Sequence, residues 1–342
     1  MELCFNAHHF GRIQVATRLS SKQLLDCILF AINESGWQAI VLNATKPYRL
    51  RLFRGDDNGF DVRIYIWNCT HGGGSARAED EYRVQITGVV PDLALKETTL
   101  LLGWHSGYEV FVGFDIHKHV GQASQSPSIQ VKEDTLLNAH VHAFATHRRE
   151  NGEIAIAFRP EFLIEYALNA ASLHKNGIAA VDLSLLNSLD SLTEAQIGSI
   201  RNHERQTLLS QIARKYRSSD FRKRVLGAYR HQCAACGLQL ELIDAAHIIP
   251  VAANTSTDET KNGIALCKLH HTAFDRNLLS FDESYRIEVS ESEVTRLTAI
   301  NRIDGLREFQ RHLRTAIILP SDRRDYPPPQ YISEARKVRN WI

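Results

Sequence analysis

The stretch CKLHHTAFD, residues 267–275, places a cysteine, two further residues and then two adjacent histidines in a row. Neighbouring side chains on a helix point about 100° apart, so two adjacent imidazoles do not readily serve one tetrahedral ion. We therefore expect His270 and His271 to have different functions. One of them would complete a metal cluster, and the other would belong to a second site.

A matching pair of cysteines lies upstream, in CAAC at residues 233–236. CAAC and CKLH (267–270) both have the two-residue gap that lets two side chains of a tight turn reach one ion, and 30 residues separate them. A redox role for C-x-x-C would need a thioredoxin-like context, which this sequence lacks. The predicted ligands of a structural Zn²⁺ are Cys233, Cys236, Cys267 and His270. His271 is then available for a different site.

Four further polar residues lie between the two cysteine motifs or just after them. They are Asp244, His247, Asn262 and His271. With them, the run FRKRVLGAYRHQCAACG…AAHIIP…NGIALCKLHHTAFD resembles the HNH nuclease family, and in particular the HNH domains of bacterial restriction endonucleases. The resemblance covers residues 218–290. It implies a zinc-stapled ββα-metal motif with a histidine on the first strand, an asparagine in the loop or second strand, and a histidine on the helix.

The resemblance also implies a role for each residue in phosphodiester hydrolysis. His247 would be the general base that deprotonates water, because histidine titrates near neutral pH. His271 would hold a single Mg²⁺ or Mn²⁺ at the phosphate. Asn262 would fix the loop that orients His247, through an amide that does not titrate.

The acidic ligand of this cation is where the sequence departs from the family. Many members carry it directly before the first histidine, and this chain has Ala246 there. Asp244 is the nearest carboxylate, although residues 244 and 247 face opposite sides of an ideal strand. We predict that Asp244 binds the catalytic cation if the strand bulges or ends there, and a hydrogen-bonding role stays open. Asp275, four residues after His271, could instead support the site.

The segment before the cysteine motifs is strongly basic. Residues 201–230 contain nine Lys and Arg against two acidic residues, although the whole chain has a formal net charge of only +1. A charge run is usually a solvated helix face. Beside a metal cluster we expect it to contact phosphates instead, so the segment predicts a DNA-binding helix. Its predicted contacts are Arg214, Lys215, Arg217, Arg222, Lys223 and Arg224.

The first 170 residues predict an α+β domain. SKQLLDCILFAINESGW (21–37) has a helical pattern, and five β-rich runs follow it. Several runs alternate apolar and polar residues, which favours a half-exposed, mixed but mainly antiparallel sheet with flanking helices. GEIAIAFRPEFLIEYALNA (152–170) predicts a closing strand that turns through Pro160 into a helix. The predicted parts of this α+β chain are residues 1–170, a linker and basic helix at 171–217, the HNH domain at 218–290 and a Pro-rich, partly helical extension at 291–342.

The stretch RLFRGDDNGFDVRIYIWNCTHGGGSARAEDEYRVQITG (51–88) interleaves arginines with aromatic residues. Aromatic side chains in a sheet are more often core residues than ligand contacts. An HNH module has little sequence preference of its own, because it grips the duplex mainly through phosphates. We therefore predict that the first domain reads DNA, with Trp67 and Tyr82, and next Trp104, as candidates to stack on a flipped or modified base.

Two short motifs in the same domain carry pairs of histidines. HKH (117–119) and HVH (140–142) each place two histidines on one face of a predicted strand. Exposed polar strand positions explain them more simply than a metal site does.

The composition excludes several classes of protein. With 44% hydrophobic and 23% charged residues the chain is neither disordered nor fibrous, and no stretch approaches 18 uncharged apolar residues. The first 20 residues lack the basic-then-apolar order of a signal peptide. We expect a cytoplasmic protein without a membrane partner, in which a local cysteine cluster binds metal.

Together these features predict a restriction-type endonuclease, of type II or modification-dependent, that hydrolyses double-stranded DNA. One HNH site cuts one strand, so a double-strand break implies two copies and hence a homodimer. Two alternatives stay open. One is a defence effector nuclease gated by a small signalling ligand, and the other is a non-catalytic, zinc-dependent DNA-binding regulator.

Overall fold

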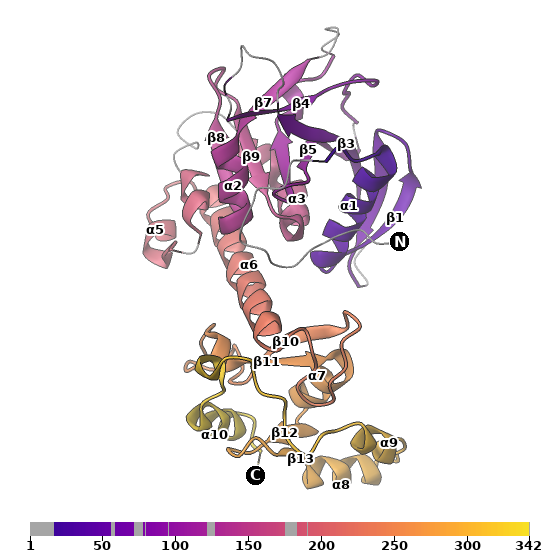
Figure 1. The fold of residues 1–342 in the computed structure, drawn as a ribbon, viewed down its shortest axis with the longest axis vertical. Helices are drawn as coiled ribbons and strands as arrows, with labels where there is room; N and C mark the ends of the chain where they lie inside the picture. The colour runs from indigo at the N-terminus through magenta and orange to yellow at the C-terminus, as the bar shows by residue number, and fades with distance from the viewer. Residues whose placement is uncertain are drawn as a thin grey trace. The chain divides into compact units, whose positions relative to one another are not determined.

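The computed structural model describes residues 17–55, 59–71, 78, 80–94, 96–121, 127–174, 183–189 and 191–341. The chain divides into two units, residues 1–214 and 215–342, and the border falls within helix α6 (His203–Ala228) (Figure 1). In the described part of the chain, no helix is both long and apolar enough to pass through a lipid bilayer. Of the interleaved stretch 51–88, residues 56–58, 72–77 and 79 lie outside the described residues.

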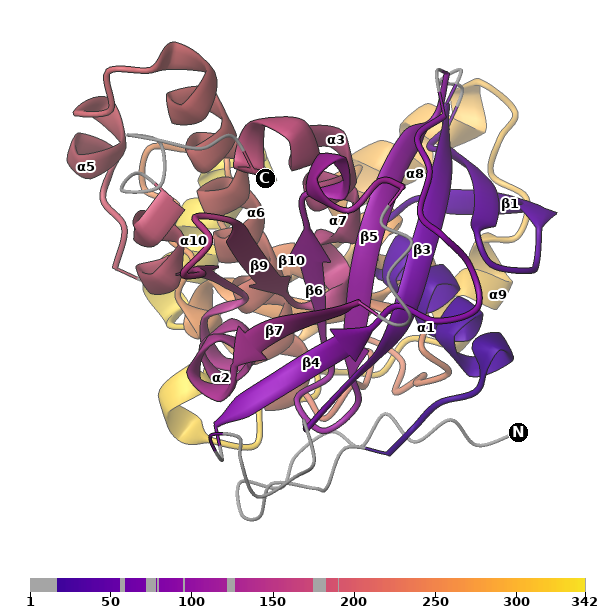
Figure 2. The ribbon, with the colours of Figure 1, turned by 90° about the horizontal axis from the view of Figure 1, so that it is seen from above.

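The first unit is built on one large sheet. Its strands are β1 (Gln38–Asn43), β2 (Tyr48–Phe53), β3 (Phe60–His71), β4 (Glu81–Gln85), β5 (Thr98–His105), β6 (Val110–Phe114), β7 (Ser128–Lys132), β8 (Phe144–Arg148) and β9 (Ile154–Phe158). Seven of them follow the order β1-β2-β3-β5-β6-β9-β8, while β4 pairs with the end of β3 and with β7. The β3–β5 pair is parallel and the other pairs are antiparallel (Figure 2). The predicted mixed, mainly antiparallel sheet is confirmed.

The helices of this unit begin where the sequence offers the right chemistry. They are α1 (Ser21–Glu34), α2 (Glu133–His142), α3 (Leu163–His174), α5 (Glu194–Gly198) and the start of α6, with the short 3-10 helices η1 (Ile116–Lys118), η2 (Pro160–Phe162) and η3 (Ser184–Ser188). Ser20 caps α1 by accepting from the amide of Gln23, whose side chain accepts from Ser20 in return. Pro160 opens η2, which leads the chain from β9 into α3 as predicted.

The central strands are covered on both faces, whereas β1 and β2 keep exposed positions, so the expected half-exposure holds for only part of the sheet. On one face, α1 packs against β1, β3 and α3, and α3 packs against β5 and β9. On the other face, α2 and the β4–β7 pair share a core with residues of β3 and β6. Strands β6 and β9 are therefore buried along their whole length. Gly113 of β6 allows this close packing, because a Cβ there would overlap the ring of Tyr166.

The two histidine pairs predicted on strands lie in helices. HKH begins within η1 and His119 ends it, whereas HVH forms the last turn of α2. Three residues are too few to separate a two-residue period from a helical one. His119 is buried and its Nε2 lies 2.8 Å from Glu153 Oε1, so this histidine makes a buried structural hydrogen bond.

The second unit contains a hairpin with a helix packed against it. Its elements are the end of α6, β10 (Ile243–His247), η4 (Thr260–Asn262), β11 (Gly263–Cys267), α7 (Lys268–Asp275), β12 (Leu279–Phe281), β13 (Ile287–Val289), α8 (Glu291–Ala299), α9 (Leu306–Arg311), η5 (Arg323–Asp325) and α10 (Pro329–Val338). Strands β10 and β11 are antiparallel, with His247 opposite Gly263, and α7 packs on both. Ile332 and Ala335 of α10 reach the same apolar core. This strand–strand–helix order is the predicted ββα arrangement.

Candidate metal centre and active site

Three cysteines and one histidine converge in the second unit. The ligand atoms of Cys233, Cys236, Cys267 and His270 all lie within 4.8 Å of one another. His270 Nδ1 is 3.5 Å from Cys233 Sγ and 3.2 Å from Cys267 Sγ. Tetrahedral Zn²⁺, with Zn–S of about 2.3 Å and Zn–N of about 2.0 Å, puts these atoms about 3.5 Å apart. The predicted cluster is present, and its four donors fit a Zn²⁺ ion.

The backbone explains why the two cysteine motifs meet. The amide of Gly237 bonds the carbonyl of Cys233, and Gly237 takes a positive φ of 84° to close the first turn. Ala234 then donates to Ala265 of β11, the strand whose last residue is Cys267. Sequence spacing closes each turn, and the hairpin brings the turns together.

The thiols of this cluster need a cation beside them. Burial raises the pKa of Cys236 to about 12 and also raises that of Cys267. For Cys233 burial acts in the same direction, but hydrogen bonds from His270 and from backbone amides outweigh it and lower the pKa to about 6. A bound divalent cation deprotonates its thiol ligands, and its positive charge offsets the cost of burying the negative thiolates.

The two adjacent histidines point to different partners. His270 is 1% exposed and faces the cysteines. The side chain of His271 is 23% exposed, and its Nε2 lies 3.3 Å from Asp275 Oδ2, one helical turn further on. His271 is thus directed away from the cluster, toward a carboxylate.

His247 ends strand β10 and is held from two sides. Its ring stacks on Phe221 of α6, with centroids 3.8 Å apart and planes 10° apart. Its Nε2 lies 3.0 Å from Asp258 Oδ1. Gly263, opposite His247, allows α6 to approach, because a Cβ there would overlap Val225. Asp258 lies in the loop before η4 and was not predicted as a site residue.

Asn262 ties together the loop that follows His247. Its side chain is fully buried; Oδ1 accepts from the amide of Ile249 at 2.9 Å, and Nδ2 donates to the carbonyl of Thr257 at 2.8 Å. Its own carbonyl accepts from the amide of Ile248. The loop that carries Asp258 is therefore fixed at both ends by one amide side chain.

Asp244 has the hydrogen-bonded environment that was left open as the alternative to cation binding. Its Oδ1 accepts from Arg222 Nε at 3.0 Å and its Oδ2 from Lys268 Nζ at 2.7 Å. Burial alone would raise the pKa of Asp244, but the hydrogen bonds and charges of Lys268 and Arg222 lower it below its ordinary value. Because two cationic side chains bond both oxygens, these contacts support the hydrogen-bonding role that was left open, and we propose Asp244 as an ion-pair partner rather than a cation ligand.

The replacement of Asp244 by Asn tests this assignment. We expect Asp244→Asn to leave the Mg²⁺ concentration for half-maximal cleavage unchanged within about twofold, because the residue holds Arg222 and Lys268. The free energy of unfolding should fall by about 1 kcal/mol above the unfolded-state pKa of the carboxyl, and this difference should vanish as the pH falls through the lowered folded-state pKa. Urea unfolding at several pH values and a Mg²⁺ titration measure both. A large loss of Mg²⁺ affinity would restore Asp244 as a ligand.

The donors for a catalytic cation are few. Among the described residues, the cysteine cluster supplies the one group of three or more His, Cys, Asp or Glu ligand atoms that lie together. His247 and His271 instead each face one carboxylate, Asp258 and Asp275 respectively. Mg²⁺ is commonly held by one or two carboxylates, with water and substrate phosphate as its other ligands. The residues present fit a hydrated divalent cation of this kind.

A second residue that was not predicted reaches the same place. The Arg339 side chain, at the end of α10, donates to the carbonyl of His247 and lies 3.9 Å from Asp275. It is 92 residues from His247 in the sequence, so no local motif could have indicated it. Asp258, by contrast, lies within the stretch between the cysteine motifs, where its acidic character was the available signal.

The predicted DNA-binding residues of α6 fall into three groups. Arg222 bonds Asp244, and Arg224 bonds Asp220 and Thr260, so both support the second unit itself. Arg214 and Lys223 are exposed. Lys215 and Arg217 are partly buried and have interactions of their own.

The aromatic candidates of the first unit are mostly core residues. Trp67 is 6% exposed, donates to the carbonyl of Thr87 and has Lys46 Nζ 4.1 Å from its ring centre. Trp104 is buried against Phe111. Neither ring offers a free face to a base, so we withdraw the stacking role for both. Tyr82 is half-buried, its ring packs edge-on against His71 and His105, and its stacking role stays a prediction.

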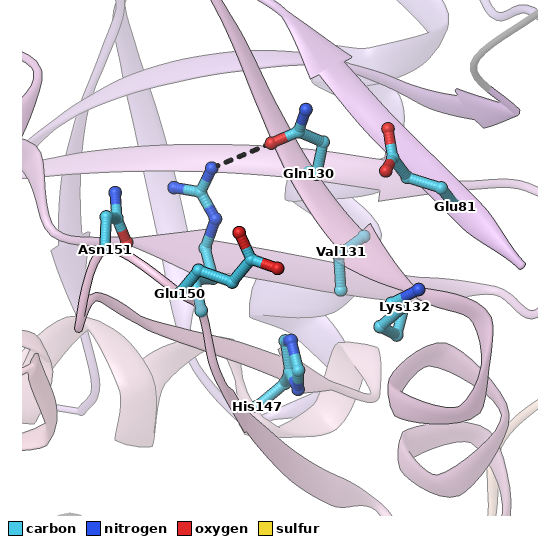
Figure 3. Close-up of a pocket in the computed structure, with 8 residues that line it drawn as sticks. Glu81, Gln130, Val131, Lys132, His147, Glu150 and Asn151 are labelled. Carbon is cyan, nitrogen blue, oxygen red and sulfur yellow. Dashed lines mark hydrogen bonds between the residues drawn. The ribbon is translucent and has the colours of Figure 1, made fainter. Parts of the chain in front are cut away.

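A pocket of about 330 Å³ lies on the first unit (Figure 3). Its lining residues are Glu81, Gln130, Val131, Lys132, His147, Arg149, Glu150 and Asn151. Arg149 bonds Gln130 across the pocket, and it also pairs with Glu153. The lining mixes both charges and, in this described region, contains no Phe, Tyr or Trp, so it lacks a stacking surface for a base.

Comparisons with known proteins distinguish the two units. Residues 233–282 match the family model described as HNH endonuclease, and residues 60–167 match the one described as Methylase-associated X1. No curated protein matches the chain. A solved structure titled "Modification dependent TagI restriction endonuclease" is similar over 96% of this chain and 94% of that chain. Its 13% identity and TM-score of 0.27 are too low to carry an argument.

Proposed function

We propose that this chain, whose residues 233–282 form an HNH endonuclease domain, is a restriction-type enzyme that hydrolyses the phosphodiester bonds of double-stranded DNA. One observation carries the proposal: His247 and His271 each face a carboxylate on a strand–strand–helix unit that a Cys₃His cluster staples. A purely structural zinc module would not need His247 and His271 in addition to His270.

The proposed chemistry assigns one step to each side chain. His247 accepts the proton of the attacking water, with its ring held by Phe221 and Asp258. His271 and Asp275 would hold a divalent cation, which would supply the positive charge that phosphodiester hydrolysis needs. Asn262 keeps the loop between His247 and strand β11 in place.

The choice of target belongs, in this proposal, to the first unit together with α6. The exposed Arg214 and Lys223 are suited to phosphates, which fix a protein on the duplex without reading sequence. The family matched by residues 60–167 is described as associated with methylases, which suits a reader of modified bases. Tyr82 is the remaining candidate to contact such a base.

Two copies of the chain would act together in this scheme. A single HNH site cuts one strand, so a double-strand break needs a second site related by a twofold axis. The free thiols of the cluster suit a reducing compartment, and we place the enzyme in the cytoplasm.

Digestion of plasmid DNA tests the proposed function. The purified chain, with its zinc retained, is mixed with unmodified plasmid and with plasmids methylated at cytosine or adenine. We expect cleavage of one class of plasmid with Mg²⁺ or Mn²⁺ and none in buffer without a divalent cation. Omitting the cation, rather than adding a chelator, leaves the structural zinc in place.

Two results would contradict the proposal in different ways. Equal DNA binding with and without Mg²⁺, and no cleavage of any plasmid, would indicate a non-catalytic regulator. Cleavage that begins only after a nucleotide or cyclic oligonucleotide is added, without regard to DNA modification, would indicate an effector gated by a signalling ligand.

A further inference from the structure

The C-terminal helix α10 delivers a basic side chain to the nuclease site. Arg339 caps the end of α10, and its side chain is 11% exposed. Asn277, just beyond α7, donates from Nδ2 to the carbonyl of Arg339 at 2.9 Å and fixes the end of the helix. The guanidinium lies 4.3 Å from the centre of the Phe274 ring. Asn277 thus fixes the main chain of Arg339, and the Phe274 ring supports its side chain.

The guanidinium of Arg339 joins the two elements that carry the site histidines. Nη2 donates to the carbonyl of His247, at the end of β10, at 3.3 Å. Nη1 donates to the carbonyl of Phe274, in the last turn of α7, also at 3.3 Å. The Phe274 carbonyl also accepts from the amide of Asn277, and the helix dipole makes the end of α7 favourable for a cation. One rigid planar group thus sets the spacing between β10 and the C-terminal end of α7.

The charge of Arg339 is poorly compensated for a residue so deeply placed. Its nearest carboxylate, Asp275, is 3.9 Å away, and its Nε is buried without a hydrogen-bond partner in the described structure. Burial lowers the pKa of the guanidinium, which the charge of Asp275 partly offsets. An arrangement of this kind is costly for stability alone. Its contacts with His247 and Phe274 suggest a reason for it at the active site.

A second contact shows that α10 also reaches the loop on the other side of His247. Tyr331, at the start of the helix, donates to Glu259 at 2.8 Å, one residue after Asp258. Lys261 Nζ lies 5.7 Å from the centre of the Tyr331 ring. The helix therefore contacts β10, α7 and the Asp258 loop, which are the three elements that present the site residues.

We propose that Arg339 is a positioning residue of the HNH site, which holds the His247 end of β10 at a fixed distance from the His271 helix. The proposal rests on the proposed nuclease function. Under this proposal, the C-terminal extension (residues 291–342) contributes to the nuclease site through helix α10. Arg339 acts through main-chain carbonyls, so its removal changes the arrangement of His247 and His271 and leaves the DNA-contacting surface intact.

Three variants of the full chain test the proposal. In Arg339→Ala we expect kcat to fall about 10- to 100-fold, the usual loss when a residue that orients site groups is removed. KM for DNA should stay within about twofold, since no DNA contact is lost. Arg339→Lys should restore part of kcat, because an ammonium can bond one of the two carbonyls. Zinc content and the fraction of folded protein should match the wild type in both variants.

Arg336→Ala is the matched control. Arg336 is on the same helix, pairs with Glu288, donates to the carbonyl of Phe281 and lies 5.7 Å from the Trp341 ring. It has the same kinds of contacts but none with the site histidines. We expect its kcat to remain within about threefold of the wild type. A general weakening of α10 would lower kcat equally in Arg336→Ala and Arg339→Ala, and that result would overturn the proposal.

Hydrogen exchange separates this inference from the proposed function. In Arg339→Ala, the amides of residues 247–249 and 275–278 should exchange faster than in Arg336→Ala, whether or not the protein cuts DNA. If the wild-type protein cleaved no DNA but these amides still exchanged faster in Arg339→Ala, the positioning contact would be supported and the nuclease proposal would fail. Unchanged exchange, or a raised KM with an unchanged kcat, would overturn the role proposed for Arg339.

Discussion

Replacing His247 by Ala should lower the cleavage rate by about 10²- to 10⁴-fold, the usual contribution of a general base. His247 is the histidine at the end of β10, and its imidazole is already oriented by Asp258 and by the ring of Phe221. The loss should appear in kcat, because the base acts in the transition state. Single-turnover cleavage of plasmid DNA measures it.

The same variant should keep its zinc and bind DNA as the wild type does. The ring stack on Phe221 contributes to stability, so we expect the free energy of unfolding to fall by about 1 kcal/mol. His312→Ala is the matched control, since His312 is an exposed histidine of the same unit. If His247→Ala cut DNA within a factor of about ten of that control, the assignment of the general base would be wrong.

Replacing His270 by Ala should remove the structural metal and unfold the second unit. His270 is buried and supplies one of the four donors of the cluster, and structural zinc contributes about 10–16 kcal/mol of apparent binding free energy in small zinc domains. Metal analysis and thermal unfolding of the purified protein measure the loss. His270→Cys, which restores a fourth ligand, should recover both zinc and fold.

His271→Ala should behave in the opposite way. It should keep one equivalent of zinc and remain folded, because His271 faces Asp275 and not the cysteines. Cleavage should be lost, or should need a higher concentration of Mg²⁺. One equivalent of zinc in a folded His270→Ala protein, or loss of zinc from His271→Ala, would contradict the division of function between the adjacent histidines.

The metal cluster could be predicted from sequence because its information is local. Two-residue gaps bring Cys233 to Cys236 and Cys267 to His270 within single turns, whatever the rest of the chain does. The divergence of His270 and His271 follows in the same way from the geometry of α7. Strands β2, β3, β5 and β9 were also recognisable, because each is either an apolar run or a run that alternates apolar and polar residues.

Features set by distant residues could not be predicted. Asp244 was assigned from its closeness to His247 in sequence, whereas its partners Arg222 and Lys268 lie 22 and 24 residues away. Arg339 reaches the site from the far end of the second unit. The arginines interleaved with aromatics suggested a DNA surface, yet Arg51 pairs with Asp61. In the same way, Trp67 turned inward because a second layer of strands covers its face of the sheet.

Helix α6 carries residues with two proposed roles, DNA binding and support of the site residues, and mutations cannot easily separate these roles. Phe221 supports the imidazole of His247, and Arg222 and Arg224 hold Asp244 and the neighbourhood of Asp258. If α6 contacts DNA as proposed, a charge-reversal scan along it would therefore combine weaker DNA binding with a changed arrangement of the proposed site residues. Lys223 is exposed between Arg222 and Arg224, and it is the position where the proposed DNA binding could be altered without disturbing the site residues.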